Sequence, residues 1–288
     1  MSSMREIKNR INATAKTSQI TKAMNMVSAS KLRKVDKQNR AFQPTRERIK
    51  QVLEDILSTY FEVSHPLLIP REIKRTGYIL VTSDRGLAGP YNNNLLKTFK
   101  AHLAKNHVSN DEFIVGTIGF KGFSFCKRNQ YPMINTESVN SRDEIEFIDF
   151  QVMSRAFIKD YLDHKVDKIV VFYNHYINTL TQTIATEELL PITSLVNKRE
   201  KKVSEFLFEP SPQAVIDSLL PIYLENRLFG IILDAKTSEH AARMTAMKNA
   251  TDNAEEVISK LNLYYNRARQ NAITIELTDI IGGANAVN

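Results

Sequence analysis

The last 67 residues of the chain limit most strongly what it can fold into. No proline follows Pro221, and glycine occurs only at Gly230, Gly282 and Gly283. Apolar residues recur there every three or four positions, which predicts one helix from about residue 213 to about residue 280. At about 1.5 Å per residue, such a helix would span roughly 100 Å, more than a compact domain can bury. Most of it must therefore lie against another helix.

The first 64 residues supply the only other long helical segment. Before Pro44, their apolar residues form one narrow stripe with steps of mostly three to five positions, which is typical of a helix. We expect Pro44 to bend or briefly interrupt this helix, and the two prolines in HPLLIP (65–70) to end it. The two ends of the chain, 1–64 and 213–288, are therefore predicted to form an antiparallel coiled coil.

The two helices are expected to bury little apolar surface between them. In SEHAARMTAMKNATDNAEE (238–256) the apolar residues are mainly alanine and methionine rather than leucine or isoleucine. Small side chains allow close approach of two helices but bury less apolar surface, which stabilises the pair less. This pattern favours a slender pair of helices that fits inside something else.

The middle of the chain, 75–209, has a different pattern. Short β-branched runs at 77–84, 113–119 and 168–174 alternate with helical stretches at 91–106 and 150–162. This alternation predicts an α/β domain with a mainly parallel sheet. The segment LTQTIATEELLP (180–191) alternates polar and apolar residues and is expected to be an edge or antiparallel strand, and FLFEPSP (206–212) a last strand and turn.

The charge of the chain is unevenly distributed. Residues 1–50 contain thirteen Lys or Arg and three Asp or Glu, a net charge of +10, whereas the whole chain carries +7. A basic segment on a nearly neutral body suggests an acidic partner: DNA, RNA, an anionic membrane or an acidic protein surface. Phe42 is the only aromatic residue in this segment, so stacking on nucleic-acid bases has little support.

No set of residues in the sequence has the pattern of a catalytic, cofactor or metal site. The segment TSDRGLAGPYN (82–92) could place backbone N–H groups around an anion, but it lacks the GxGxxG and Walker patterns and reads more simply as a structural turn. Cys126 is the single cysteine and is expected to be buried and inert. None of the six histidines has metal-ligand spacing, and His240 is expected on a helix surface or in the helix seam.

Several of these segments resemble one known family. ITKAMNMVSASKLRK (20–34) resembles the N-terminal signature of the F-type ATP synthase gamma subunit, and residues 82–92 are similar to its glycine-rich loop. Residues 238–256 and YNRARQNAITIELTDIIGGA (265–284) resemble its C-terminal signature. The resemblance implies a Rossmann-like α/β domain that binds no nucleotide. It also implies that the coiled coil is a rotor shaft inside a ring of three alpha and three beta subunits.

The resemblance also implies which residues contact partners. Contacts with the beta subunits are expected from Arg269, Gln270, Thr274, Glu276, Met24, Lys22 and Arg33. Contacts with the membrane c-ring, beside the epsilon subunit, are expected from Phe206, Phe208 and Glu209. The family's frequent cysteine in the glycine-rich loop is Ala88 here, which weighs against a thiol function in that loop.

The expected role is therefore non-catalytic: a shaft that couples ion flow through the c-ring to the cycling of the beta subunits. No cofactor or nucleic acid is expected, and membrane association should be indirect. Because the family signature begins almost at Met1, we expect a bacterial protein at the cytoplasmic face of the cell membrane. A basic coiled-coil nucleic-acid binder and an α/β enzyme that uses residues 82–92 remain alternatives, and co-purification with alpha and beta subunits would separate the three.

Overall fold

The computed structural model describes residues 4–59, 64–137, 139, 147–196, 208–209 and 211–287. Two long helices lie at the ends of the chain, and strands alternate with shorter helices between them. The elements are α1 (Met4–Thr59), β1 (Thr76–Val81), α2 (Tyr91–Asn106), the 3-10 turn η1 (Asn110–Glu112), β2 (Phe113–Ile118), α3 (Phe120–Arg128), α4 (Phe147–Leu162), β3 (Lys168–Tyr176), β4 (Gln182–Leu190), α5 (Thr193–Val196) and α6 (Pro212–Val287). The fold class is the predicted one, a central α/β sheet domain with long terminal helices.

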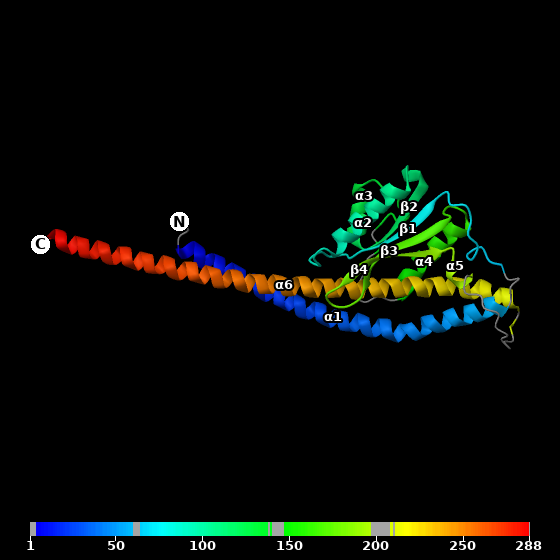
Figure 1. Ribbon diagram of the computed structural model, residues 1–288, viewed down its shortest axis with the longest axis horizontal. Coiled ribbons are helices and arrows are strands. Elements are labelled where there is room, and N and C mark those ends of the chain that lie inside the picture. Colours follow the sequence, from blue (N-terminus) through cyan, green and yellow to red (C-terminus); the bar gives the residue numbers. More distant parts are fainter. Residues whose placement is uncertain are drawn as a thin grey trace. The chain divides into compact units, whose positions relative to one another are not determined.

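The sheet has four strands in the order β2-β1-β3-β4 (Figure 1). Strand β1 pairs in parallel with both β2 and β3, and β4 pairs antiparallel with β3 at the edge. The β-branched runs thus form the parallel centre, and the alternating segment after residue 180 forms the antiparallel edge strand, as predicted. Helix α3 follows β2 directly after Gly119.

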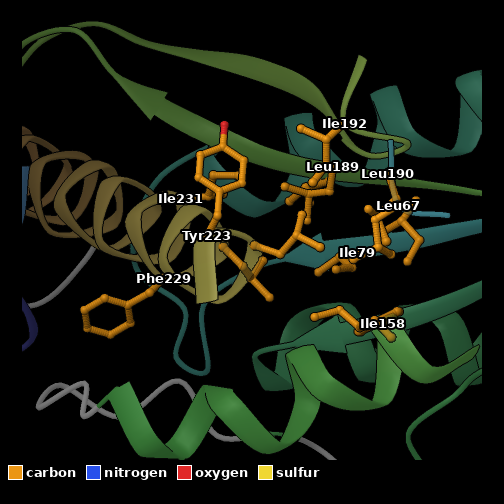
Figure 2. Packing of buried hydrophobic residues seen from close by; sticks show 14 of the residues in the cluster. Leu67, Ile79, Ile158, Leu189, Leu190, Ile192, Tyr223, Phe229 and Ile231 are labelled. Atoms are coloured by element: carbon orange, nitrogen blue, oxygen red, sulfur yellow. The ribbon is translucent and has the colours of Figure 1, made fainter. Parts of the chain in front are cut away.

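Apolar side chains cover both faces of this sheet. The larger cluster joins Ile79 and Val171 of the sheet to α4 and to residues 216–235 of α6, and Figure 2 shows part of it. The smaller cluster joins Leu80 and Phe172, which point to the opposite face, to α2 and α3. Neighbouring residues of one strand enter different clusters because side chains alternate across a strand. Residues 216–235 of α6 are therefore part of the α/β core.

Contacts divide the chain into two compact units, residues 1–28 with 243–288, and residues 29–242. Within the first unit, α1 and α6 run antiparallel: Thr21 Oγ1 lies 2.7 Å from Thr251 Oγ1, and Asn25 Nδ2 donates to the Met244 carbonyl at 2.8 Å. Apart from Arg243, the buried side chains of this unit are small or medium-sized: Ile7, Ser18, Thr21, Ser28, Met247, Thr251, Ala254 and Leu261. A narrow seam between the terminal helices is thus present. The boundaries predicted at residues 64, 75, 209 and 213 stay predictions.

Two expectations about local structure differ from the structure. Pro44 was expected to bend or briefly interrupt the N-terminal helix, and the interruption is absent, because α1 is continuous through Pro44. Next to the proline, the Phe42 ring packs edge-on against Phe229 with centroids 5.0 Å apart. Such packing offsets the lost backbone hydrogen bond. Neither Phe208 nor Glu209, which fall in the expected last strand and turn (206–212), is in a strand, and residues 206 and 207 lie outside the described residues.

The turn between β2 and α3 requires glycine at position 119. Gly119 has φ +90°, and a Cβ there would lie 2.2 Å from the carbonyl oxygen of Thr82. We expect Gly119→Ala to reduce the free energy of unfolding by about 2–4 kcal/mol, as measured by chemical denaturation. Gly86→Ala is the matched control, because nothing lies within 4 Å of a Cβ at that position. Equal stability of Gly119→Ala and the wild type would contradict this account of the turn.

Candidate partner-binding surface

The C-terminal part of α6 exposes a stripe of large apolar side chains. Leu261 is the last residue of α6 that is buried among those whose side chains the structure describes. Beyond it, Ile273, Leu277, Ile280 and Ile281 are 48%, 54%, 62% and 60% exposed. Their spacing of four, three and one places them on one face of the helix. An exposed apolar stripe of this kind is a candidate site of protein contact.

This apolar stripe, the four residues just named, lies beyond the reach of α1. The pairs Thr21 with Thr251 and Asn25 with Met244 fix the antiparallel register of the two helices. Continued along two α-helices, this register brings Met4 opposite about residue 267 of α6. Figure 1 likewise shows the C-terminal end of α6 continuing past the N-terminal end of α1. The stripe therefore has no helix of the described chain to cover it.

The residues predicted to contact beta subunits divide between the two long helices. All four predicted on α6 are exposed: Arg269, Gln270, Thr274 and Glu276. Thr274 donates its hydroxyl to the Gln270 carbonyl at 2.9 Å, so that proton is already engaged within the helix. On α1, Lys22 and Arg33 are exposed and Met24 is half-buried. Arg33 belongs to the second compact unit, whereas Lys22 and Met24 belong to the first.

The residues predicted to contact the c-ring are only partly described. Glu209 is exposed. Phe208 is half-buried and packs against the larger apolar cluster of the sheet, so part of its side chain is already in contact with the core. Phe206 lies outside the described residues. The c-ring assignment of all three stays a prediction.

The glycine-rich segment 82–92 holds α6 to the sheet. The Tyr91 hydroxyl donates to the Ala235 carbonyl at 2.9 Å, and Ala88 and Tyr91 are buried together with Ala242. Within the segment, the side chain of Asn92 accepts a hydrogen bond at 3.1 Å from the backbone N–H of Ser83, which is at the other end of the segment. Tyr91, Ala88 and Asn92 are thus occupied by contacts within the chain. This geometry supports the interpretation as a structural turn over that as an anion site.

A second contact between the sheet and α6 was missed in the sequence. Asp234 accepts from the Tyr176 backbone N–H at 3.1 Å, and its Oδ2 lies 2.5 Å from Nδ1 of His175. Burial raises the pKa of the Asp234 carboxyl group, and the hydrogen bonds from His175 and Tyr176 act against this. The partners are almost sixty residues apart in sequence, so no local pattern could reveal the pair.

Cys126 and His240, which were considered as possible reactive or metal-binding residues, are both buried. Cys126 is fully buried, and burial raises the pKa of its thiol to about 12, which fits the predicted inert role. His240 is 1% exposed, which excludes a position on the helix surface. Across the described ranges, no three or more His, Cys, Asp or Glu side chains form a group that could hold a metal ion. None of the helices in those ranges is both long and apolar enough for a bilayer crossing.

Comparisons with protein families and with solved structures point to the same family. The family model for ATP synthase matches residues 3–287 of this sequence. A chain of the Euglena gracilis mitochondrial ATP synthase OSCP, F1 and c-ring structure, in rotational state 3, is 20% identical with a TM-score of 0.68, and the match covers 99% of this chain and 94% of that one. A chain of the rotor structure from the same organism is 16% identical with a TM-score of 0.64, covering 94% and 98%.

A chain of the Tetrahymena thermophila mitochondrial central stalk and c-ring structure is 22% identical with a TM-score of 0.58, covering 80% of this chain and 99% of that one. At these identities the solved structures establish a shared fold. The family match spans nearly the whole sequence. The chain therefore belongs to the ATP synthase family that this model describes, the family of the gamma subunit.

Proposed function

We propose that this chain is the central rotor shaft of an F-type ATP synthase. In this role it couples ion flow through the c-ring to the conformational cycle of the catalytic beta subunits, and it has no catalytic role of its own. The observation that carries the proposal is the exposed apolar stripe of α6, which extends beyond α1. In a ring of three alpha and three beta subunits, such a stripe would be covered by the inner surface of the ring.

The energetics favour contact over a broad surface. A shaft biases a beta subunit only by the difference in its contact energy with the open and closed forms. Moving a population from 1:99 to 99:1 requires about 5.5 kcal/mol of such difference, whereas one exposed salt bridge contributes about 0–1 kcal/mol. Burial of one large apolar side chain contributes about 1.5–3 kcal/mol. We therefore expect the apolar stripe to carry more of the coupling than any single charged residue.

The remaining partners follow from the family role. The foot of the shaft would contact the c-ring through the segment around Phe208 and Glu209, beside the epsilon subunit. Membrane association would then be peripheral and indirect. A position at the cytoplasmic face of a bacterial membrane stays a prediction, and the solved structures compared above come from mitochondrial complexes.

Reconstitution tests the proposal directly. Purified alpha and beta subunits are assayed for sustained ATP hydrolysis and for rotation, with and without the full chain. We expect the chain to co-purify with the alpha–beta ring and to support rotation. Salt-dependent binding to DNA or RNA without preference for alpha and beta subunits would instead favour the nucleic-acid alternative.

The predicted polar contacts are tested by single substitutions on α6. Arg269→Ala and Gln270→Ala are each expected to reduce coupled turnover partially, because each removes one exposed polar contact. Thermal unfolding of the isolated chain should not change, since both side chains are exposed. Deletion of residues 282–288 should be milder still. Normal ATP synthesis by both substituted complexes would remove these two residues from the proposed contact surface.

A further inference from the structure

Helices α2 and α3 together form a basic surface on one side of the sheet. Both helices pack on the face of the sheet opposite to α6, and they contact each other (Figure 1). Neither helix contains Asp or Glu, and all of their Lys and Arg side chains are exposed. We call these six residues the basic face: Lys97, Lys100, Lys105, Lys121, Lys127 and Arg128.

The basic face has no carboxylate that neutralises it. Residues 85–110 and 113–136 contain no Asp or Glu. Asp84 and Glu112, at the borders of these segments, accept backbone hydrogen bonds from Phe120 and Val108, both at 3.0 Å. Within the part of the chain that the structure describes, none of the six cationic side chains forms an ion pair or a hydrogen bond. The face therefore presents six uncompensated positive charges to the solvent.

The stability of the two helices explains only half of these charges. Basic residues in the last turn of a helix interact favourably with its dipole, which accounts for the three cations at the ends of α2 and α3. Lys121, however, is the second residue of α3, where the dipole disfavours a positive charge. Lys97 and Lys100 are about one turn apart on α2 and repel each other. Charges that act against local stability are typical of a surface that has a function.

The basic face has the size of a short segment of chain. The axes of two packed helices are about 8–10 Å apart. At about 1.5 Å per residue, Lys97 and Lys105 lie about 12 Å apart along the axis of α2. An extended chain covers this length with about four residues, and its side chains alternate between its two sides. An acidic segment that lies along the two helices can therefore direct carboxylates to the cations of both.

We propose that the basic face binds an acidic segment of another protein, one with several Asp or Glu residues within a few positions. The charges of such a segment complement those of the face, and each carboxylate would gain a cation that has no other partner. This interaction goes beyond the proposed rotor function, because none of the residues assigned there to beta-subunit or c-ring contacts lies on α2 or α3.

A lipid surface and a nucleic acid match the basic face less well. Stable attachment to a membrane needs an apolar anchor in addition to positive charge. Both helices are fully described, and Phe120, at the start of α3, is their only large apolar residue that is exposed. Nucleic-acid surfaces use aromatic stacking and the bidentate geometry of arginine. Here five of the six cations are lysines, which attract carboxylates without a fixed geometry.

The test measures binding of a fluorescent oligoglutamate peptide to the full chain. Replacing Lys97, Lys100 and Lys121 by glutamine should weaken binding by about tenfold, because three charge contacts are lost. Thermal unfolding should not decrease, since these side chains are exposed. In the unsubstituted chain, the NMR amide signals of α2 and α3 should shift at lower peptide concentration than those of α1. If the α1 signals shift first, the proposal is overturned.

A second triple variant controls for the loss of net charge. It replaces Lys8, Arg10 and Lys16, three exposed cations of α1, by glutamine and should weaken peptide binding by less than about threefold. Equal losses in the two variants would show only a general effect of charge and would overturn the proposal.

The other two classes of partner are tested with the same variants. The probes are oligothymidylate of equal charge and vesicles of phosphatidylcholine with phosphatidylserine. We expect the substitutions on α2 and α3 to weaken peptide binding more than binding of either probe. If they weaken DNA or vesicle binding as much, the basic face does not select an acidic protein segment. All of these measurements use the chain without alpha and beta subunits, so their outcome is separate from that of the rotor proposal.

Discussion

Replacing Arg71 by methionine is expected to lower the free energy of unfolding of the chain by about 3 kcal/mol, because it leaves a buried carboxylate and two carbonyl groups without their cation. Nε of Arg71 lies 2.8 Å from Oδ1 of Asp167. Nη2 donates to the Tyr161 carbonyl at 2.7 Å and also to the Val166 carbonyl, and Nη1 lies 2.8 Å from Nδ1 of His164. The guanidinium carbon also lies 4.2 Å from the centre of the Tyr161 ring.

Arg71 thus joins the segment before β1 to the end of α4, and methionine can replace only its apolar contacts. Lys165→Ala is the control, because the ion pair of Lys165 with Asp160 at 2.8 Å is at the exposed surface of the same region. Such pairs contribute little, so no measurable change in stability is expected. Chemical denaturation of the three proteins provides the comparison. Equal stability of Arg71→Met and Lys165→Ala would show that the buried ion pair adds nothing to the fold.

The ion pair of Arg71 with Asp167 also predicts how the stability of the chain depends on pH. Burial acts to raise the pKa of the Asp167 carboxyl, but backbone hydrogen bonds from Lys74 and Arg75 and the charge of Arg71 outweigh burial and lower it. A carboxyl whose pKa is lower in the folded state stabilises the fold above its unfolded pKa of about 3.9, and this contribution is lost as the pH falls through the folded value. The stability difference between the wild type and Asp167→Asn should therefore shrink in acid below about pH 4. A difference that is constant with pH would contradict this assignment.

The parts of the fold that could be predicted are those with a local signal. The absence of proline and glycine after Pro221 predicted a helix from about residue 213 to 280, and α6 runs from Pro212 to Val287. The β-branched runs became the parallel strands because both of their faces are buried, and the alternating segment became the edge strand β4. In each of these cases, local propensity and tertiary packing favour the same structure.

The parts that could not be predicted depend on contacts between distant residues. Pro44 signals a break by itself, but packing of the neighbouring Phe42 on Phe229 keeps α1 continuous. The hydrogen bonds of Tyr78 with two histidines more than twenty residues away have no sequence pattern either. The candidate contact residues of α6 came from resemblance alone, and the structure adds that they are exposed. The apolar stripe needed the structure, because periodicity cannot tell a covered apolar face from an exposed one.

Replacing the four residues of the apolar stripe by serine is expected to abolish rotation-coupled ATP synthesis in a reconstituted complex. Burial of the exposed part of the four side chains against the ring would contribute about 3–7 kcal/mol in total, which is comparable with the roughly 5.5 kcal/mol that a full population shift requires. These energies are upper values, because part of each contact is the same in every state of a beta subunit. The loss should still be much larger than that of Arg269→Ala, which removes one exposed charge.

The substitutions should leave the isolated chain folded, because all four side chains are already about half exposed or more. The matched control replaces Ile177 and Leu180, which are 52% and 79% exposed near the β3–β4 connection, by serine. It removes exposed apolar surface of the same kind, from two side chains rather than four, in the α/β unit and should leave coupling intact. The readouts are thermal unfolding of each chain, co-purification with alpha and beta subunits, and ATP synthesis. If the stripe variant supports synthesis as well as the control variant, the end of α6 is not a torque-bearing surface, and the coupling must depend on other parts of the two helices.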